Sequence, residues 1–141
     1  MDGAGAGGRV LRGLCDTNVL VRHFTGDPPD MAAAATRFLA SATELLVPDV
    51  VLAELVYVME SVYGVPREQV AELGRAVVGF PPVVMTDPEV ALRTLEVYER
   101  HRLDFADAYL VAVAEATGLR RIASFDSAIR RVPWVDVVTP R

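Results

Sequence analysis

The chain has 141 residues, of which 52% are hydrophobic and 23% charged, and its formal net charge is −5. This length fits one domain with a hydrophobic core, and the composition excludes an intrinsically disordered chain. The longest apolar stretches are interrupted by Glu54 and Asp107, so we expect no membrane-spanning helix. All 14 basic residues are arginines, which excludes sites that need a lysine, such as Schiff-base or P-loop sites.

The N-terminal residues and the cysteine usage indicate the setting of the protein. Residues 1–8, MDGAGAGG, lack an apolar segment, so we expect a flexible tail rather than a secretory signal. Cys15 is the only cysteine, which excludes an intramolecular disulfide and a cysteine-based zinc cluster. We therefore expect a cytoplasmic protein with a single domain over residues 9–141.

From residue 9 onward, short apolar strands alternate with longer helices. The predicted strands are Arg9–Cys15, Glu44–Val47, Val83–Met85, Arg121–Ser124 and Val135–Thr139. The predicted helices are Asn18–Phe24, Asp30–Ala42, Asp49–Tyr63, Pro66–Val78, Asp87–Arg100, Asp104–Thr117 and a short one at Ser127–Arg131. This alternation predicts an α/β fold with a parallel sheet that is covered by helices on both faces.

The helix Asp49–Tyr63, which we expect Asp49 to cap, is apolar on nearly all sides. Its expected inward stripe is Val51, Leu55, Val58 and Val62, but further apolar residues lie between these positions. Two interpretations are equally compatible with this pattern. The helix is either buried within one subunit, or it packs on the sheet with one side and on another chain with the other.

Four acidic residues stand where hydrophobic patterning asks for another residue type, or at the carboxyl end of a strand, where open α/β sheets build their sites. They are Asp16, Glu54 at the edge of the buried stripe, Asp107 and Asp126. For any single strand-end acid, an N-cap or turn is the alternative role. Several carboxylates held together repel one another and need a cation, either arginine or a divalent metal. Carboxylates without histidine or cysteine favour Mg²⁺ or Mn²⁺.

Short polar side chains adjoin these acids. Thr17 and Asn18 follow Asp16, and Ser124 precedes Asp126 by two residues, so they could orient a carboxylate or serve as ordinary turn and cap residues. Asp104 lies one helical turn before Asp107. We favour a helix N-cap for Asp104 over a direct role in the site.

The same residues resemble the successive signatures of PIN-domain ribonucleases, above all the VapC toxins of VapBC toxin–antitoxin pairs. The matching segments are DTNVLVRHFTGDPP at Asp16–Pro29, LAELVYV at Leu52–Val58, DFADAYLVAVA at Asp104–Ala114 and IASFD at Ile122–Asp126. The resemblance runs from about Leu14 to Val138. Four motifs in family order are much more specific than any one of them.

The resemblance implies a PIN-like three-layer α/β/α sandwich with a central, mainly parallel sheet. It also implies Mg²⁺- or Mn²⁺-dependent endonucleolytic cleavage of RNA, a homodimer, neutralisation by a VapB-type antitoxin, and a bacterial or archaeal cytoplasm. Carried over by motif, the catalytic and metal-binding residues are Asp16, Glu54, Asp107 and Asp126. The auxiliary residues are Thr17, Asn18, Asp104 and Ser124. In such a site a metal activates water for attack on the phosphodiester.

Arginines close to the motifs are candidates for binding RNA, since the planar guanidinium suits phosphate. They are Arg22 after the first motif, and Arg100 and Arg102 before the third; a solvated surface charge is the alternative for each. A Mg²⁺-binding receiver-like signalling domain is the main competing interpretation, but the chain has no lysine for it. A catalytically inactive PIN fold that serves as a binding module is a further alternative.

Overall fold

The computed structural model describes residues 12–141, and the predicted N-terminal tail at residues 1–8 lies outside them. The strands are β1 (Arg12–Leu14), β2 (Glu44–Leu46), β3 (Val83–Val84), β4 (Arg121–Ala123) and β5 (Asp136–Val138). The helices are α1 (Thr17–Thr25), α2 (Pro29–Ser41), α3 (Asp49–Ser61), α4 (Arg67–Gly79), α5 (Pro88–His101), α6 (Phe105–Thr117) and the short 3₁₀ helix η1 (Ser127–Arg131). Each element expected from the sequence is therefore present, although residues 9–11 of the expected strand Arg9–Cys15 lie outside the described residues.

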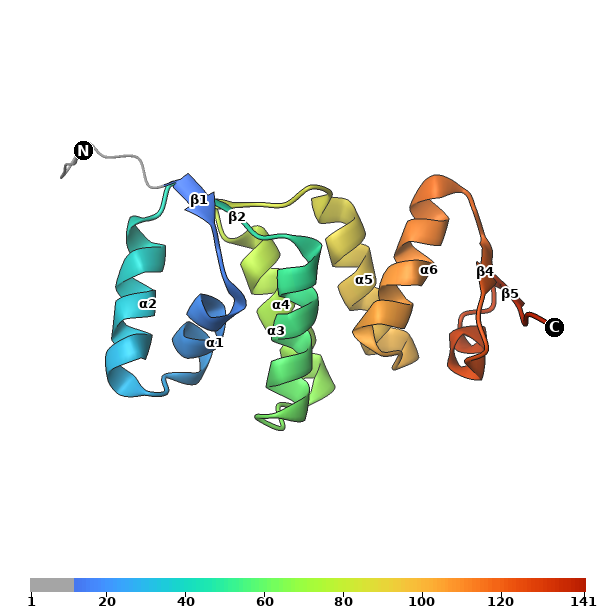
Figure 1. The fold of residues 1–141 in the computed structure, drawn as a ribbon, viewed down its shortest axis with the longest axis horizontal. Helices are drawn as coiled ribbons and strands as arrows, with labels where there is room; N and C mark the ends of the chain where they lie inside the picture. The colour runs from blue at the N-terminus through green and yellow to red at the C-terminus, as the bar shows by residue number, and fades with distance from the viewer. Residues whose placement is uncertain (1–11) are drawn as a thin grey trace.

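All strand pairs are parallel, which confirms the predicted α/β class. The strands form two sheets, one in the order β1-β2-β3 and one that joins β4 to β5. In the first sheet Leu14 is paired with Leu46, and in the second Ala123 is paired with Val138. The first sheet lies beside α1 to α4, whereas β4 and β5 lie at the opposite end of the molecule, beyond α6 (Figure 1).

Local chemistry explains where the helices begin and end. The Asp16 carboxylate accepts from the backbone N–H of Thr17 and starts α1, which stops at Gly26 in the left-handed conformation (φ 70°). The predicted cap of α3 is wrong, because Pro48 occupies the N-cap and Asp49 lies inside the first turn. Asp49 instead accepts a hydrogen bond of 2.8 Å from the hydroxyl of Tyr109 on α6. A side chain drawn into a tertiary contact is not free to cap its own helix.

The hydrophobic core is continuous from α1 to η1, and α3 lies within it. The buried residues of α3 are Leu52, Leu55, Val56 and Met59, whereas the expected inward residue Val62 is 66% exposed. The prediction for Val62 is wrong because the helix ends at Ser61, so this residue follows the last turn.

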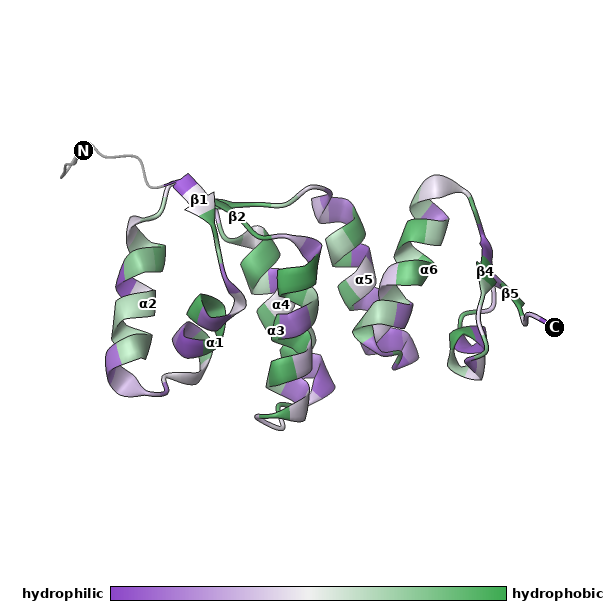
Figure 2. Cartoon of the chain, in the orientation of Figure 1, coloured by the Kyte–Doolittle hydropathy of each residue, from purple (hydrophilic) through white to green (hydrophobic). Residues whose placement is uncertain are grey.

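One face of α3 is not covered by the other elements of residues 12–141. Val50 and Tyr57 are exposed there, and Figure 2 shows hydrophobic residues over much of the helix. Of the two interpretations offered by the sequence, the structure therefore favours the helix with a face outside the subunit core. None of the helices within residues 12–141 is long and apolar enough to cross a membrane.

Candidate active site

The first motif acid lies next to the acid of α3. Thr17 connects them: its backbone N–H donates to Oδ1 of Asp16 at 2.8 Å, and its hydroxyl donates to Oε1 of Glu54 at 2.6 Å. The Thr17 side chain is buried, with 4% of its surface exposed, so its hydroxyl has a fixed direction. Asp16 and Glu54 thus form one pair of carboxylates at the carboxyl end of β1.

The third and fourth motif acids form a second pair at the start of α6 and the carboxyl end of β4. Burial raises the pKa of Asp107, and the nearby carboxylates of Asp126 and Asp104 raise it further. Asp126 also caps η1, because its Oδ1 accepts from the N–H of Ala128 at 2.9 Å. The hydroxyl of Ser124 accepts from the N–H of Asp126 at 2.9 Å and fixes the backbone there.

The structure brings the four acids together in pairs, and the two pairs lie apart. Glu54 is bound through Thr17 to α1, which follows β1 of the first sheet, whereas Asp107 lies beside Asp126, which follows β4 of the second sheet, beyond α6 (Figure 1). In the part of the chain that the structure describes, no three acidic, histidine or cysteine side chains are arranged to hold a metal ion. The donors of one chain in this arrangement therefore do not fit a carboxylate site for Mg²⁺ or Mn²⁺.

The burial of the acids also differs from the expectation. Asp16, Glu54 and Asp126 are exposed, and only Asp107 is partly buried. Glu54 was expected at the edge of the buried stripe of α3. It is instead exposed, and its hydrogen-bond partner is the hydroxyl of Thr17 at the start of α1.

The remaining predicted site residues occupy the surface around these pairs. Asn18 is exposed in the first turn of α1. Asp104 occupies the N-cap position of α6, as expected, but its side chain makes no capping hydrogen bond. Its charge acts instead on Asp107, one turn further along the same helix.

The three arginines proposed for RNA binding differ in their burial and in their interaction partners. Arg22 is partly buried and donates to the carbonyl oxygen of Asp27 at 3.2 Å. Arg100 and Arg102 are exposed and form surface ion pairs with Glu96 at 3.1 Å and Glu68 at 3.8 Å. Exposed pairs of this kind contribute little stability, so both guanidinium groups can exchange their partners for a phosphate.

One polar cluster in the core has no counterpart in the sequence analysis. The buried Tyr98 donates its hydroxyl to Glu60, and Arg67 lies over the Tyr98 ring at 4.2 Å from its centroid. Burial and the Glu60 carboxylate raise the pKa of Tyr98. These residues come from α3, α4 and α5, and the only signal in the sequence was a tyrosine at a core position of an amphipathic helix. The cluster connects α3, α4 and α5 through side-chain contacts.

Comparisons with known proteins bear directly on the motifs. The sequence model of the PIN domain matches residues 14–135. The chain belongs to the PIN domain family. A protein of Mycobacterium tuberculosis named Ribonuclease VapC26 is 30% identical in an alignment of 125 residues, which covers 84% of this chain and 93% of that protein. This PIN domain therefore resembles a VapC-type protein over nearly its full length, as the four motifs indicated.

Proposed function

We propose that this PIN domain is an endoribonuclease toxin of a type II toxin–antitoxin module. The observation that carries the proposal is the likeness to Ribonuclease VapC26, which covers 84% of this chain and 93% of that protein. The sequence supports it, because all four motif acids are present and carboxylates are the side chains that metal-assisted phosphodiester hydrolysis requires. Membership of the PIN family speaks against a receiver-like signalling domain.

We propose that the activity depends on Mg²⁺ or Mn²⁺. The ligands would be Asp16 and Glu54 from one pair and Asp107 and Asp126 from the other, and the metal would supply an activated water and charge neutralisation. Since one chain leaves these pairs apart, we derive no reaction step through the ion. Thr17, Ser124, Asn18 and Asp104 would orient the carboxylates.

We also propose the partners that such a module requires. The substrate would be RNA, whose phosphates would contact Arg100 and Arg102 first and Arg22 after it leaves Asp27. A VapB-type antitoxin would neutralise the protein in the cytoplasm, and the chain would form a homodimer. Co-expression with the product of the reading frame directly upstream tests the antitoxin: relief of growth arrest is expected, and persistent arrest would count against this partner.

The decisive experiment measures cleavage of RNA by the purified chain with Mg²⁺ or Mn²⁺. We expect cleavage that EDTA stops. We expect Asp16→Asn and Asp107→Asn to lower the rate by at least about 100-fold, because even outer-shell partners of metal ligands cost 10- to 100-fold. Asp30→Asn is the matched control, since Asp30 is an exposed acid in the first turn of α2, away from both pairs.

Each outcome has a defined meaning when circular dichroism shows that the variants are folded. Unchanged cleavage by Asp16→Asn and Asp107→Asn would refute the assignment of the site. A parent chain that binds RNA but does not cleave it with either metal would support the inactive PIN binding module instead. Loss of activity in Asp30→Asn would show that the effect does not depend on the site.

A further inference from the structure

The first strand of the larger sheet has an unusual environment for a parallel strand. Parallel strands are normally buried on both faces, yet all three residues of β1 are exposed, and Leu14 is 69% exposed. Within residues 12–141, β1 is hydrogen-bonded as a strand to β2 alone, so its other edge has no partner. An exposed apolar edge of this kind is a template for another strand.

The smaller sheet carries the complementary edge. In the described part of the chain it consists of β4 and β5 alone, so the edge of β4 opposite β5 is free there. Phe125, two residues after the end of β4, is 82% exposed, and Val138 on β5 is also exposed. The charged residues of β1 and β4 do not oppose strand pairing at these edges, because Arg12 pairs with Glu44 on β2 and Arg121 pairs with Asp136 on β5.

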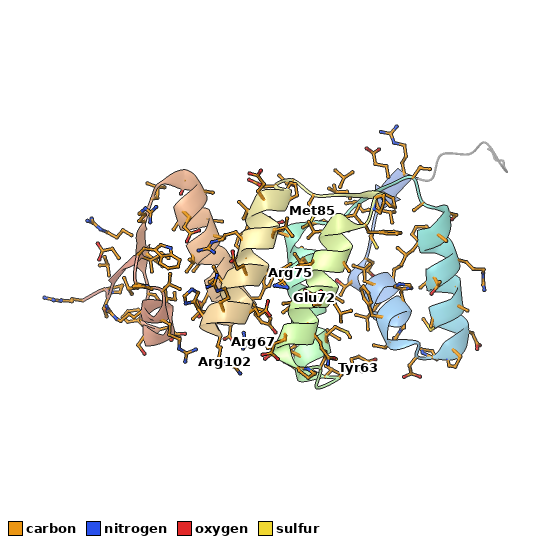
Figure 3. All side chains as sticks on the ribbon, turned by 180° about the vertical axis from the view of Figure 1, so that it is seen from behind. Tyr63, Arg67, Glu72, Arg75, Met85 and Arg102 are labelled. Carbon is orange, nitrogen blue, oxygen red and sulfur yellow. The ribbon has the colours of Figure 1, made fainter. Side chains whose placement is uncertain are left out.

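The two edges do not meet within one chain in this structure. The second sheet follows α6, which packs on α5 through Arg93, whose Nε donates to Oε1 of Glu115 at 2.7 Å. Arg67 donates to the carbonyl oxygens of Tyr98 and Leu103 at 2.8 Å and 2.7 Å, so the connection from α5 to α6 is fixed against α4. Figure 3 shows Arg67 and Arg102 at one end of these helices, and Figures 1 and 3 both place β4 and β5 far from β1.

The separation of the sheets coincides with the separation of the acids. Asp16 lies two residues after β1, and Asp126 lies three residues after β4. If β4 lies parallel to β1 with Ala123 opposite Leu14, Phe125 lies opposite Asp16. Adjacent strands are about 4.8 Å apart, so Asp126 then adjoins Asp16. Asp107 and Glu54 are then brought to the same place, because Asp107 already lies beside Asp126 and Glu54 is bound through Thr17 beside Asp16.

We propose that the active site of this protein is shared between two copies of the chain, in which the free edge of β1 pairs with the free edge of β4 of the other copy. The exchange is reciprocal, so a dimer has two sites. Each site takes Asp16 and Glu54 from one chain and Asp107 and Asp126 from the other. A second copy is the occupant because it supplies both the missing strand edge and the missing pair of carboxylates. The catalytic part of this inference rests on the proposed ribonuclease function.

A disulfide cross-link tests the strand pairing without any activity. In a Cys15→Ala background, one chain carries Leu14→Cys and a second, differently tagged chain carries Ala123→Cys. Parallel neighbours on paired strands lie within the Cα separation of a disulfide, about 4.4–6.8 Å. After co-expression we expect a mixed disulfide dimer on non-reducing gels, and no cross-link in either single variant alone. A monomer by light scattering without a mixed disulfide would overturn the proposal.

Complementation between two inactive variants tests the shared site. Asp16→Asn and Asp107→Asn each remove a carboxylate from a different pair. In a mixed dimer, one site therefore contains both changes and the other site contains neither. We expect co-expression to restore up to about one quarter of the parent activity, because half of the dimers are mixed and one of their two sites is intact. Asp16→Asn with Glu54→Gln is the matched control and must stay inactive, since both changes spoil the same pair.

The results separate this inference from the proposed function. If each chain closes on itself, the parent cleaves RNA, the mixture of Asp16→Asn and Asp107→Asn stays inactive, and no mixed disulfide forms; this refutes the shared site alone. A mixed disulfide in a protein that cleaves no RNA supports the exchanged strands and refutes the ribonuclease. Restored activity together with the mixed disulfide supports both.

Discussion

Replacement of Thr17 by valine tests whether the link between Asp16 and Glu54 serves activity. Valine keeps the shape of threonine and removes the hydroxyl that donates to Oε1 of Glu54 at 2.6 Å. A hydrogen bond to a charged group contributes about 1.5–3 kcal/mol. Glu54 is exposed, so water replaces most of that bond, and we expect a loss of about 1 kcal/mol. This corresponds to a fall in Tm of roughly 2–5 °C for a domain of this size.

The effect on activity should exceed the effect on stability. Without the hydroxyl, Glu54 loses its fixed direction, and we expect the rate of RNA cleavage to fall by about 10- to 100-fold, as for other residues that orient ligands. Thr17→Ser keeps the donor and loses a buried methyl, which costs about 1 kcal/mol. We therefore expect Thr17→Ser to match Thr17→Val in Tm and to retain most of the activity.

Thr94→Val is the matched control. Thr94 is fully buried, and its hydroxyl donates at 2.7 Å to the carbonyl oxygen of Val90 on its own helix. We expect little change in Tm and full activity. Thermal unfolding followed by circular dichroism and RNA cleavage rates measure both quantities. Full activity of Thr17→Val, or equal losses of activity in Thr17→Val and Thr17→Ser, would refute the positioning role.

Two further predictions concern the helices that hold the sheets in place. A Cβ at Gly74 would lie 2.6 Å from Cδ2 of the buried Leu95, so we expect Gly74→Ala to be destabilised by up to about 2 kcal/mol after the gain in helix propensity. Gly79→Ala meets no atom within 4 Å and should not be destabilised; equal Tm values for the two variants would contradict the close contact. The hydrogen bond from Arg93 lowers the pKa of Glu115 in the folded protein. This pair therefore stabilises the fold at pH values above the pKa of glutamate in the unfolded chain, about 4.3. The stabilisation is lost as the pH falls through the lower pKa of the folded state. Glu115→Gln should be less stable than the parent in urea at pH 7 and should approach it near pH 3, and a difference that grows toward low pH would contradict this sign.

The sequence predicted the elements well because their ends carry strong local signals. The helix expected at Asp104–Thr117 is found at Phe105–Thr117, and Gly118 ends it with φ 76°. Local signals failed where a tertiary contact decided the outcome. Asp49 was expected to cap its helix and instead binds Tyr109, sixty residues away. No pattern within one helix contains that information.

The candidate site shows the same division. Spacing gave each acid as a candidate together with the neighbours Thr17 and Ser124, and the hydrogen bonds of these two neighbours are found in the structure. Which acids lie together depends on the order of strands in the sheets. Strands of three residues, such as β1 and β4, carry too little pattern to specify which edges pair. The sequence could therefore name the acids but not their distances.

The single tryptophan reports on only one part of this chain. Trp134 lies edge-on to His101 at 5.5 Å, within 5.4 Å of the Arg93 guanidinium, and its indole N–H donates to Glu115. Its fluorescence therefore senses the packing of the last helices and the C-terminal strands, whereas circular dichroism senses every helix. If the two signals change at different urea concentrations, the C-terminal part unfolds as a separate cooperative unit. Such stepwise unfolding is expected of a protein whose C-terminal strands pair with another copy of the chain and not with the sheet of their own chain.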